Sequence, residues 1–313
     1  MSCSNPRNRQ PDVVRRRQIL GLGLLSAMPA LADSGGRQLD LSNYEASFAA
    51  DFTGPAKPLL RSDGGPFSSR YEDWGGLRTL PGNKEQELYV DAGFIPAAAG
   101  TDARGHADAP AGSPIRPLGI NPFVFESDGL EITAIQTPPP LRRAVDRPYL
   151  SGMLATDRTF SQRYGYFEML ARLPAGRGLW PAFWLVSKTY QEHIEIDVME
   201  AVGWDTAHVY QSTHLNPSRG KGIHVKVGPE EFDYATGFHS YGVAWTPDDL
   251  VFYIDGIETT RTGGRPFRDI PPMYMIANLA VGGEWAGTPD HDTRFPAAMQ
   301  IKHIRAYRLR GPA

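Results

Sequence analysis

The stretch "HIEIDVME" at residues 193–200 places three acidic residues inside a short apolar run. Glu195 and Asp197 alternate with isoleucine and valine, so both acidic side chains lie on one face of an extended strand. Glu200 does not follow this alternation, because the next position on that face is Met199. A β-bulge, which inserts one extra residue into a strand, returns Glu200 to the face of the other two acids. The spacing therefore predicts a bulge beside Met199 and three carboxyl groups that converge.

The rest of the chain is typical of an all-β protein. Short runs rich in β-branched and aromatic residues are separated by clusters of turn-forming residues, and one run places Leu130, Ile132 and Ala134 on a single face. No stretch of twelve or more residues shows the apolar periodicity of a helix. Many short strands with dense turns predict a β-sandwich or barrel. The predicted strands lie at residues 129–135, 164–173, 194–200, 208–215, 240–246, 250–256, 273–281 and 301–309.

The first 32 residues have the pattern of an export signal. Three arginines at residues 15–17 precede an apolar run that ends in Ala-Leu-Ala at residues 30–32, the small-residue pattern of a cleavage site. The run is too short for a membrane-spanning helix. The run "RRRQIL" also resembles a twin-arginine signal, and the sequence leaves that route and the general secretory route open. We expect a signal peptide at residues 1–32, a single catalytic domain at residues 33–313, and a periplasmic or extracellular protein.

Removal of this segment would change the cysteine content and the charge of the protein. Cys3, the one cysteine in the sequence, would be lost, so no disulfide is predicted. The segment also holds five arginines and one aspartate, so the 32 basic and 35 acidic residues of the whole chain become 27 and 34, a net charge of −7. An acidic surface argues against nucleic acid or an anionic membrane as the partner. We expect a monomer that binds neither.

A low-complexity segment at residues 96–117 interrupts the strand-like sequence. It is rich in alanine, glycine and proline, and sequence typical of strands lies on both sides of it. This arrangement predicts a long surface loop within one domain rather than a linker between two domains.

Three converging carboxyl groups suit two kinds of chemistry. Retaining glycoside hydrolysis needs two carboxyl groups roughly 5–5.5 Å apart, one as the nucleophile and one as the acid/base. A divalent metal site also uses acidic ligands, often together with histidine. A third interpretation is a solvated strand face, whose acids point to water and carry no chemistry. The spacing alone leaves all three open.

Aromatic and amide residues near the acidic strand favour a sugar-binding cleft. Trp180 and Trp184 lie in the run that precedes the strand, and Asn278 and Trp285 lie in the run "NLAVGGEW". Aromatic faces stack on the apolar faces of sugar rings, while amide groups bond sugar hydroxyls. Each tryptophan alone is more typical of the core of a β-sandwich. Together with three acids, the four residues indicate a polysaccharide site.

The acidic strand also carries a resemblance to a known family. "EIDVME" resembles the bulged Glu-x-Asp-x-x-Glu signature of glycoside hydrolase family 16. Similar blocks occur in the family's order at residues 149–185, 238–256 and 273–308. The segments "RTLPGNKEQELYVD" and "LGINPFVFESDGLEITA" are similar to members associated with bacterial exopolysaccharides. The resemblance covers roughly residues 45–310.

This resemblance implies a concanavalin-like β-jelly-roll sandwich with a concave cleft, and retaining endo-hydrolysis of internal β-linkages in a glucan, galactan or exopolysaccharide. It implies Glu195 as the nucleophile, Glu200 as the acid/base and Asp197 as the assisting acid. It implies no required cofactor, and it leaves room for a structural Ca²⁺ ion whose ligands it does not identify. The substrate-binding residues that it implies are Trp180, Trp184, His214, Asn278, Trp285 and Asn83. For the pair Asn83 and Glu85 it implies either the cleft edge or structural support.

Three alternatives compete with this interpretation. A carbohydrate-binding module on the same fold binds sugar without cutting it, but it needs no pair of catalytic glutamates. A metalloenzyme could use His193, Glu195 and Asp197, with His208 or His214 as a second histidine, although nothing in the spacing requires a metal. A transglycosylase on the same scaffold passes the sugar to another sugar instead of water.

Overall fold

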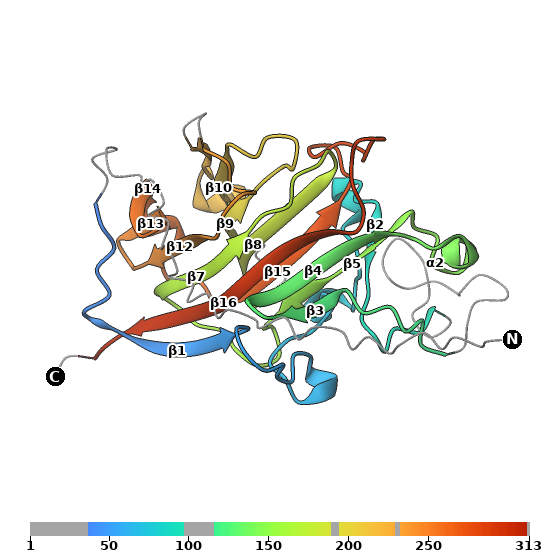
Figure 1. Ribbon diagram of the computed structural model, residues 1–313. Helices are drawn as coiled ribbons and strands as arrows, with labels where there is room; N and C mark the ends of the chain where they lie inside the picture. The colour runs from blue at the N-terminus through green and yellow to red at the C-terminus, as the bar shows by residue number, and fades with distance from the viewer. Residues whose placement is uncertain (1–36, 97–115, 189–193, 229–231, 312–313) are drawn as a thin grey trace, which may run out of the picture. The chain divides into compact units, whose positions relative to one another are not determined.

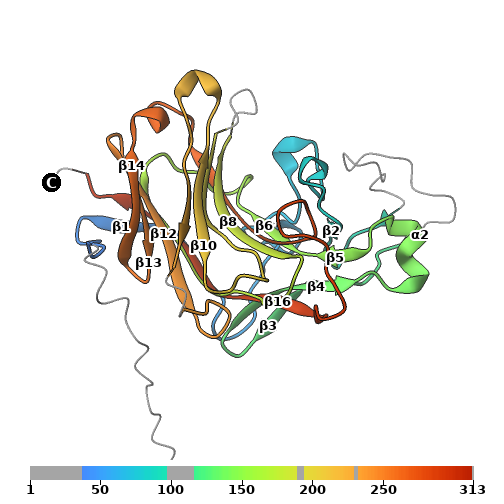
Figure 2. The same ribbon diagram turned by 90° about the horizontal axis from the view of Figure 1, so that it is seen from above.

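Two β-sheets packed face to face contain nearly all of the regular secondary structure (Figures 1 and 2). The computed structural model describes residues 37–96, 116–188, 194–228 and 232–311. These described residues belong to one unit, residues 36–313. Their strands are β1 (Tyr44–Asp51), β2 (Glu87–Tyr89), β3 (Phe123–Glu126), β4 (Gly129–Gln136), β5 (Tyr149–Ser151), β6 (Met153–Ala155), β7 (Gly165–Arg172), β8 (Leu179–Ser187), β9 (Glu195–Glu200), β10 (Val209–His214), β11 (His224–Val227), β12 (His239–Trp245), β13 (Asp249–Ile254), β14 (Ile257–Gly263), β15 (Met273–Val281) and β16 (Ala297–Leu309). Their helices are α2 (Arg142–Val145) and the 3₁₀ turns η1 (Arg61–Asp63), η2 (Glu72–Trp74), η3 (Pro81–Asn83), η4 (Pro139–Leu141), η5 (Pro217–Arg219) and η6 (Arg265–Phe267).

The larger sheet has the strand order β14-β13-β12-β7-β16-β4-β5-β2, with β1 paired to β16 and β3 paired to β4. The smaller sheet has the order β11-β10-β9-β8-β15-β6. The acidic stretch forms β9, which pairs antiparallel with β8 on one side and with β10 on the other. Its backbone groups are therefore held from both sides, in the interior of the smaller sheet. The predicted two-layer all-β architecture is confirmed.

The alternation of burial along β4 follows the predicted pattern. Leu130, Ile132 and Ala134 are fully buried, while Glu131 and Thr133 between them are partly exposed. Burial of such apolar side chains between the two sheets is the main source of folding free energy in a sandwich of this kind.

All eight strands predicted from the sequence are present, with ends that differ by a few residues. Three predicted features lie outside the described residues: the signal at residues 1–32, nearly all of the loop at residues 96–117, and His193. Within the described part of the chain, none of the helices has the length and apolar character to cross a membrane.

A segment that precedes β2 approaches the smaller sheet. Residues 71–85 contain η2 and η3, and the segment ends where Glu85 forms a bridge to Gly282, just beyond β15. The N–H of Gln86 donates to the carbonyl of Val281 at 2.7 Å. Gly282 has a φ of 85°, and a Cβ there would lie 2.5 Å from the Gln86 side chain. Only glycine permits this close approach, which fixes the segment beside the end of β15.

Candidate active site

β9 carries the predicted bulge. Met199 and Asp197 pair with consecutive residues of β8, so Val198 has no partner in that strand. The register with β10 shifts at the same place. Ile196, Val198 and Met199 are fully buried, while the three acidic side chains line a cleft. The bulge and the convergence of the acids are therefore confirmed.

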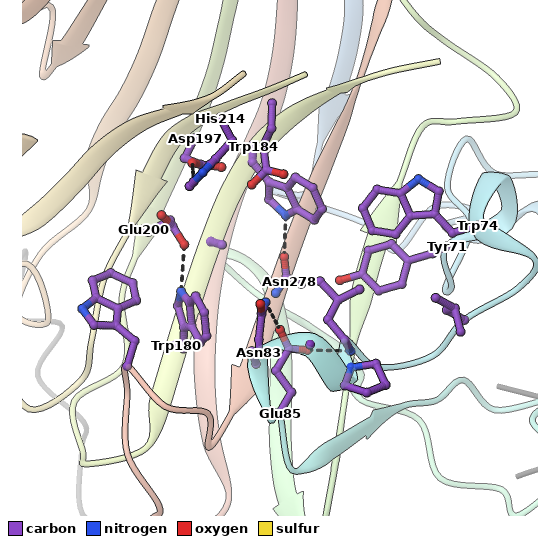
Figure 3. A pocket seen from close by; sticks show the side chains of 18 of the residues that line it. Tyr71, Trp74, Asn83, Glu85, Trp180, Trp184, Asp197, Glu200, His214 and Asn278 are labelled. Atoms are coloured by element: carbon purple, nitrogen blue, oxygen red, sulfur yellow. Dashed lines mark hydrogen bonds and ion pairs between the residues drawn. The ribbon is translucent and has the colours of Figure 1, made fainter. Parts of the chain in front are cut away.

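The cleft has a volume of about 860 Å³ and contains the acidic strand in its floor (Figure 3). Strands β8, β9, β10 and β15 supply the floor, and residues 71–85 supply a wall. Every site residue predicted from the sequence lines the cleft: Glu195, Asp197, Glu200, Trp180, Trp184, His214, Asn278, Trp285, Asn83 and Glu85. Residues far apart in the sequence thus meet in one site.

Trp184 lies in the floor of the cleft and is only 5% exposed. Its indole N–H donates to Oδ1 of Asn278 at 2.8 Å (Figure 3). Nδ2 of Asn278 in turn donates to the hydroxyl of Tyr89 at 3.0 Å. Tyr89 belongs to β2, at the end of the segment that forms the wall. Trp184 is therefore a core residue that also lines the cleft. The two hydrogen bonds, from Trp184 to Asn278 and from Asn278 to Tyr89, connect the smaller sheet to β2.

Trp180 and Trp285 form an aromatic end of the cleft. Their rings are nearly perpendicular, with centroids 5.1 Å apart, and Tyr210 packs against Trp285 at 4.9 Å. His224 stacks on Tyr210 at 5.1 Å. The indole N–H of Trp180 donates to Oε1 of Glu200 at 3.1 Å. The aromatic end is therefore joined directly to one of the acids.

The protonation of Glu200 suits a proton donor. Burial is the main cause that raises the pKa of Glu200 from 4.5 to about 8, and the negative charge of Glu195 acts in the same direction. The hydrogen bond from Trp180 favours the carboxylate and acts in the opposite direction. Glu200 therefore holds its proton at neutral pH, as a general acid must.

Asp197 also holds a proton. Burial raises its pKa well above the usual value, and the nearby charge of Glu195 raises it further. Asp197 shares a hydrogen bond with Glu195, so a protonated Asp197 donates to an ionised Glu195. Nε2 of His214 lies 3.1 Å from Oδ2 of Asp197, although this oxygen accepts no well-formed hydrogen bond from the described residues. The side chains of His214 and Asp197 are therefore close without forming a well-directed hydrogen bond.

Asn83 and Glu85 lie together on the wall. Nδ2 of Asn83 donates to Oε1 of Glu85 at 3.0 Å, and the N–H of Leu80 donates to Oε2 at 3.1 Å. Asn83 is exposed at the cleft, whereas Glu85 is 7% exposed. Asn83 thus combines the two predicted roles, because it borders the cleft and supports its neighbour.

One cluster in the cleft has the ligand types of a metal site. Glu195, Asp197 and His214 each place one donor atom within 4.8 Å of the others. The three groups also interact with one another, because Asp197 shares a hydrogen bond with Glu195 and lies 3.1 Å from Nε2 of His214. Of the two other histidines in the metalloenzyme alternative, His208 bonds Asp205 at 2.7 Å, and His193 lies outside the described residues.

Sequence reasoning missed most of the wall. Trp74 stacks on Tyr71 with ring centroids 4.8 Å apart and lies 5.9 Å from Trp184. The run "YEDWGG", with two aromatic residues beside turn-forming glycines, was a signal that could have revealed this wall. The other residues lining the cleft that were not predicted are Asp73, Leu77, Leu80, Pro81, Gly82, Ala182, His224 and Ala280.

A β-sandwich cleft with a protonated glutamate, a second carboxyl group beside it and tryptophans around both has the features of a retaining glycoside hydrolase. Residues 121–303 match the model for Glycosyl hydrolases family 16, and the chain belongs to this family.

Individual relatives agree with this assignment. Endo-1,3-1,4-beta-glycanase ExsH of Rhizobium meliloti (strain 1021) is 36% identical over 232 residues, 74% of this chain and 45% of that protein. Endo-1,3-1,4-beta-glycanase EglC of the same organism is 34% identical over 280 residues, 87% of this chain and 53% of that protein. This chain thus spans about half the length of these two relatives. The laminarinase catalytic domain of Thermotoga maritima MSB8 has a TM-score of 0.65 at 25% identity, over 86% of this chain and 100% of that chain, and the β-jelly-roll fold is thereby confirmed.

Proposed function

We propose that this protein is an exported, retaining endo-glycoside hydrolase that cleaves internal β-linkages of a polysaccharide by double displacement. The observation that carries the proposal is the pairing on β9 of a glutamate that holds its proton at neutral pH with a second carboxyl group on the same face. A sugar-binding module needs no carboxyl group with a raised pKa, so this pairing favours catalysis over binding alone.

In the first step, the carboxylate of Glu195 attacks the anomeric carbon while Glu200 gives its proton to the glycosidic oxygen. The bond between that carbon and oxygen breaks, and the shortened chain leaves with the proton. The hydrogen bond from Asp197 orients the Glu195 carboxylate toward the sugar, and Asp197, being protonated, does so without adding a second negative charge.

In the second step, Glu200 acts as the base. Once Glu195 is held in an ester, it no longer carries the charge that helped to raise the pKa of Glu200. Glu200 is then a stronger acid, and it remains ionised until it takes a proton from an incoming water molecule. The water oxygen attacks the anomeric carbon, Glu195 leaves as a carboxylate, and the configuration of the sugar is retained.

The substrate class follows from the cleft and from the relatives. Trp180 lies beside Glu200, and Trp74 lies on the wall beyond Trp184 (Figure 3), so aromatic platforms can hold sugar rings at two places along the cleft. Binding of several sugar rings suits internal cleavage. The names of the two relatives support a β-1,3/1,4-linked glucan, and the segments at residues 78–91 and 118–134 support a bacterial exopolysaccharide. Export rests on the signal pattern at residues 1–32.

Incubation with a panel of polysaccharides tests the proposal. The panel contains a β-1,3-glucan, a mixed-linkage β-1,3-1,4-glucan, a galactan and an acidic bacterial exopolysaccharide, and product lengths are followed over time. We expect oligosaccharides of intermediate length to appear first, with new reducing ends that NMR detects initially as the β-anomer. Binding to a polymer without new reducing ends would show a carbohydrate-binding protein. Longer chains made from a labelled oligosaccharide acceptor would show a transglycosylase.

A further inference from the structure

A second pair of acidic residues lies at the other side of the cleft. Glu85 lines the cleft from the wall, and Glu87 begins β2 directly behind it with no exposed surface. Their carboxyl groups are hydrogen-bonded to each other, which requires one proton between them. Among the described residues, no lysine, arginine or histidine forms an ion pair with either acid. The shared proton therefore neutralises one of the two carboxyl groups.

Burial and the neighbouring charge decide which acid holds the proton. Burial raises the pKa of Glu85, but the N–H of Leu80, Nδ2 of Asn83, the hydroxyl of Tyr89 and the carboxyl group of Glu87 all donate to Glu85 and lower its pKa. Glu87 accepts from the N–H of Val281 at 2.7 Å and from the hydroxyl of Thr79 at 3.4 Å, but its complete burial and the charge of Glu85 raise its pKa well above the usual value. Glu87 is therefore the protonated donor, and Glu85 is the ionised acceptor that faces the cleft.

The charge on Glu85 acts on Glu200. It is one of the causes that raise the pKa of Glu200, after burial and the charge of Glu195. The other groups around Glu200 are neutral or exposed: the Trp180 indole on β8, a protonated Asp197 on β9, and Tyr210, its pairing partner on β10. Around Glu85 the titratable neighbours are Glu87, Tyr89 and Tyr71. The nearby Lys84 is exposed and pairs with Glu284.

We propose that Glu85 is a positioning residue for the acid/base: its buried carboxylate, with the proton of the pair held on Glu87, keeps the catalytic proton on Glu200 until substrate has bound. This inference rests on the proposed function. The wall thereby contributes to the chemistry as well as to the shape of the cleft, and it does so through charge and without touching the reacting bond.

The pH dependence of kcat/KM separates this role from a structural one. The alkaline limb of that profile reports the loss of the Glu200 proton in the free enzyme, near pH 8. Glu85→Gln keeps the shape and the acceptor oxygen but removes the charge, so Glu200 loses its proton more easily, and we expect the limb to move to lower pH by roughly half a unit. Glu87→Gln keeps an N–H donor toward Glu85 and leaves Glu85 ionised, so its limb does not move to lower pH. Glu284→Gln removes an exposed charge from a neighbouring loop and serves as the matched control.

The outcomes distinguish a failed inference from a failed function. An inactive wild-type protein on every polymer counts against the proposed function. If the wild type is active, two results overturn the role of Glu85. The alkaline limb stays in place in Glu85→Gln, or it moves to lower pH by the same amount in Glu87→Gln and Glu284→Gln. Should Glu85→Gln fail to fold, the double variant Glu85→Gln/Glu87→Gln removes the same charge and leaves two amides that can bond each other. A limb at lower pH in that variant supports the inference, and an unmoved limb overturns it.

Discussion

Two segments at the cleft each carry a pair of acidic residues with the same spacing, but the hydrogen bonds to the acids differ. β9 carries Glu195 and Asp197, and the chain at β2 carries Glu85 and Glu87, in both cases two residues apart. At β2, backbone N–H groups and side-chain donors satisfy the two carboxyl groups. At β9, the bulge turns Glu200 toward the cleft, where the indole of Trp180 donates to it. Within the described part of the chain, Glu85 therefore has more hydrogen-bond donors than Glu200.

The two segments are also physically connected. The hydrogen bonds from Trp184 to Asn278 and from Asn278 to Tyr89 run from the floor of the cleft to β2. Trp184 itself pairs with Asp197 across β8 and β9. Hydrogen bonds and strand pairing thus join the wall to the acidic strand, and each of the following changes tests a different part of the comparison.

The largest expected difference is between glutamates of the two segments. Glu195→Gln and Glu200→Gln remove the nucleophile and the general acid, and general acid–base catalysis alone contributes roughly 10²–10⁴-fold to a rate. We expect losses of at least that size in kcat, whereas Glu87→Gln retains most of the turnover because its donor and acceptor atoms are preserved. Steady-state kinetics on the best polymer of the panel provides the measurement, with circular dichroism to verify folding. Near wild-type turnover in either β9 variant would remove that residue from the mechanism.

Rescue by azide distinguishes which of the two β9 glutamates is the nucleophile and which is the acid/base. In Glu195→Ala, the small anion can occupy the vacated position and attack the sugar, so we expect partial rescue with a product of inverted configuration. In Glu200→Ala, azide attacks the glycosyl ester on Glu195 instead, and the product retains its configuration. The same stereochemistry in both variants would contradict the assignment of nucleophile and acid/base.

The connection between the two segments is the next target. Trp184→Ala deletes a buried tryptophan and its hydrogen bond to Asn278, and such deletions cost ~3–5 kcal/mol of unfolding free energy. Trp285→Ala removes a partly exposed ring at the aromatic end, so we expect weaker substrate binding and a much smaller loss of stability. Urea unfolding together with KM measurements compares the two variants. Equal losses of stability would place Trp285 in the core as well.

The two segments share a dependence of stability on pH. The folded-state pKa of Glu200, about 8, lies above its unfolded value of 4.5, so the folded protein binds more protons between these values. The unfolding free energy therefore falls as the pH rises from about 4.5 to 8. Glu200→Gln has no such group, so its unfolding free energy does not fall for this reason. The difference in Tm, variant minus wild type, should therefore increase from pH 5 to pH 8. Glu87→Gln should show the same trend, because burial raises the pKa of Glu87 too. A Tm difference that is constant with pH would show that the replaced acid has an ordinary pKa in the folded state.

The comparison also explains what could be predicted from the sequence. The β9 acids were predictable because the alternation of Glu195 and Asp197, and the departure of Glu200 from it, are visible within six residues. Strand geometry alone then requires a bulge to bring Glu200 to the same face. The eight predicted strands had strong β-branched and aromatic patterns. Of the strands that were not predicted, β2 and β5 have only three residues each, too few for a periodic pattern, whereas β1, β8 and β14 have eight, nine and seven.

The wall was harder to predict for a physical reason. Residues 71–85 contain no strand, and their position depends on contacts with β15 and Gly282, about two hundred residues further along the chain. No local pattern shows that Glu87 meets Val281 or that Tyr89 meets Asn278. Catalytic acids on one strand therefore leave a signature in the sequence, whereas supporting acids on a separate segment do so only through the fold.

The smallest expected effect concerns the hydrogen bond from Trp180 to Glu200. The indole N–H of Trp180 lies 3.1 Å from Oε1 of Glu200 and favours its carboxylate form, so it lowers the pKa of this group. Trp180→Phe keeps an aromatic ring against Trp285 but removes that donor. The pKa of Glu200 should then rise above about 8, and the alkaline limb of kcat/KM should move to higher pH by roughly half a unit. This direction is opposite to the one expected for Glu85→Gln, although both changes leave the acid itself intact. A profile recorded on a short chromogenic oligosaccharide measures the limb, and KM reports any loss of ring stacking separately. If the Trp180→Phe limb stays in place or moves to lower pH, the hydrogen bond to Glu200 does not form in the working enzyme, and Trp180 serves only as a platform for the sugar.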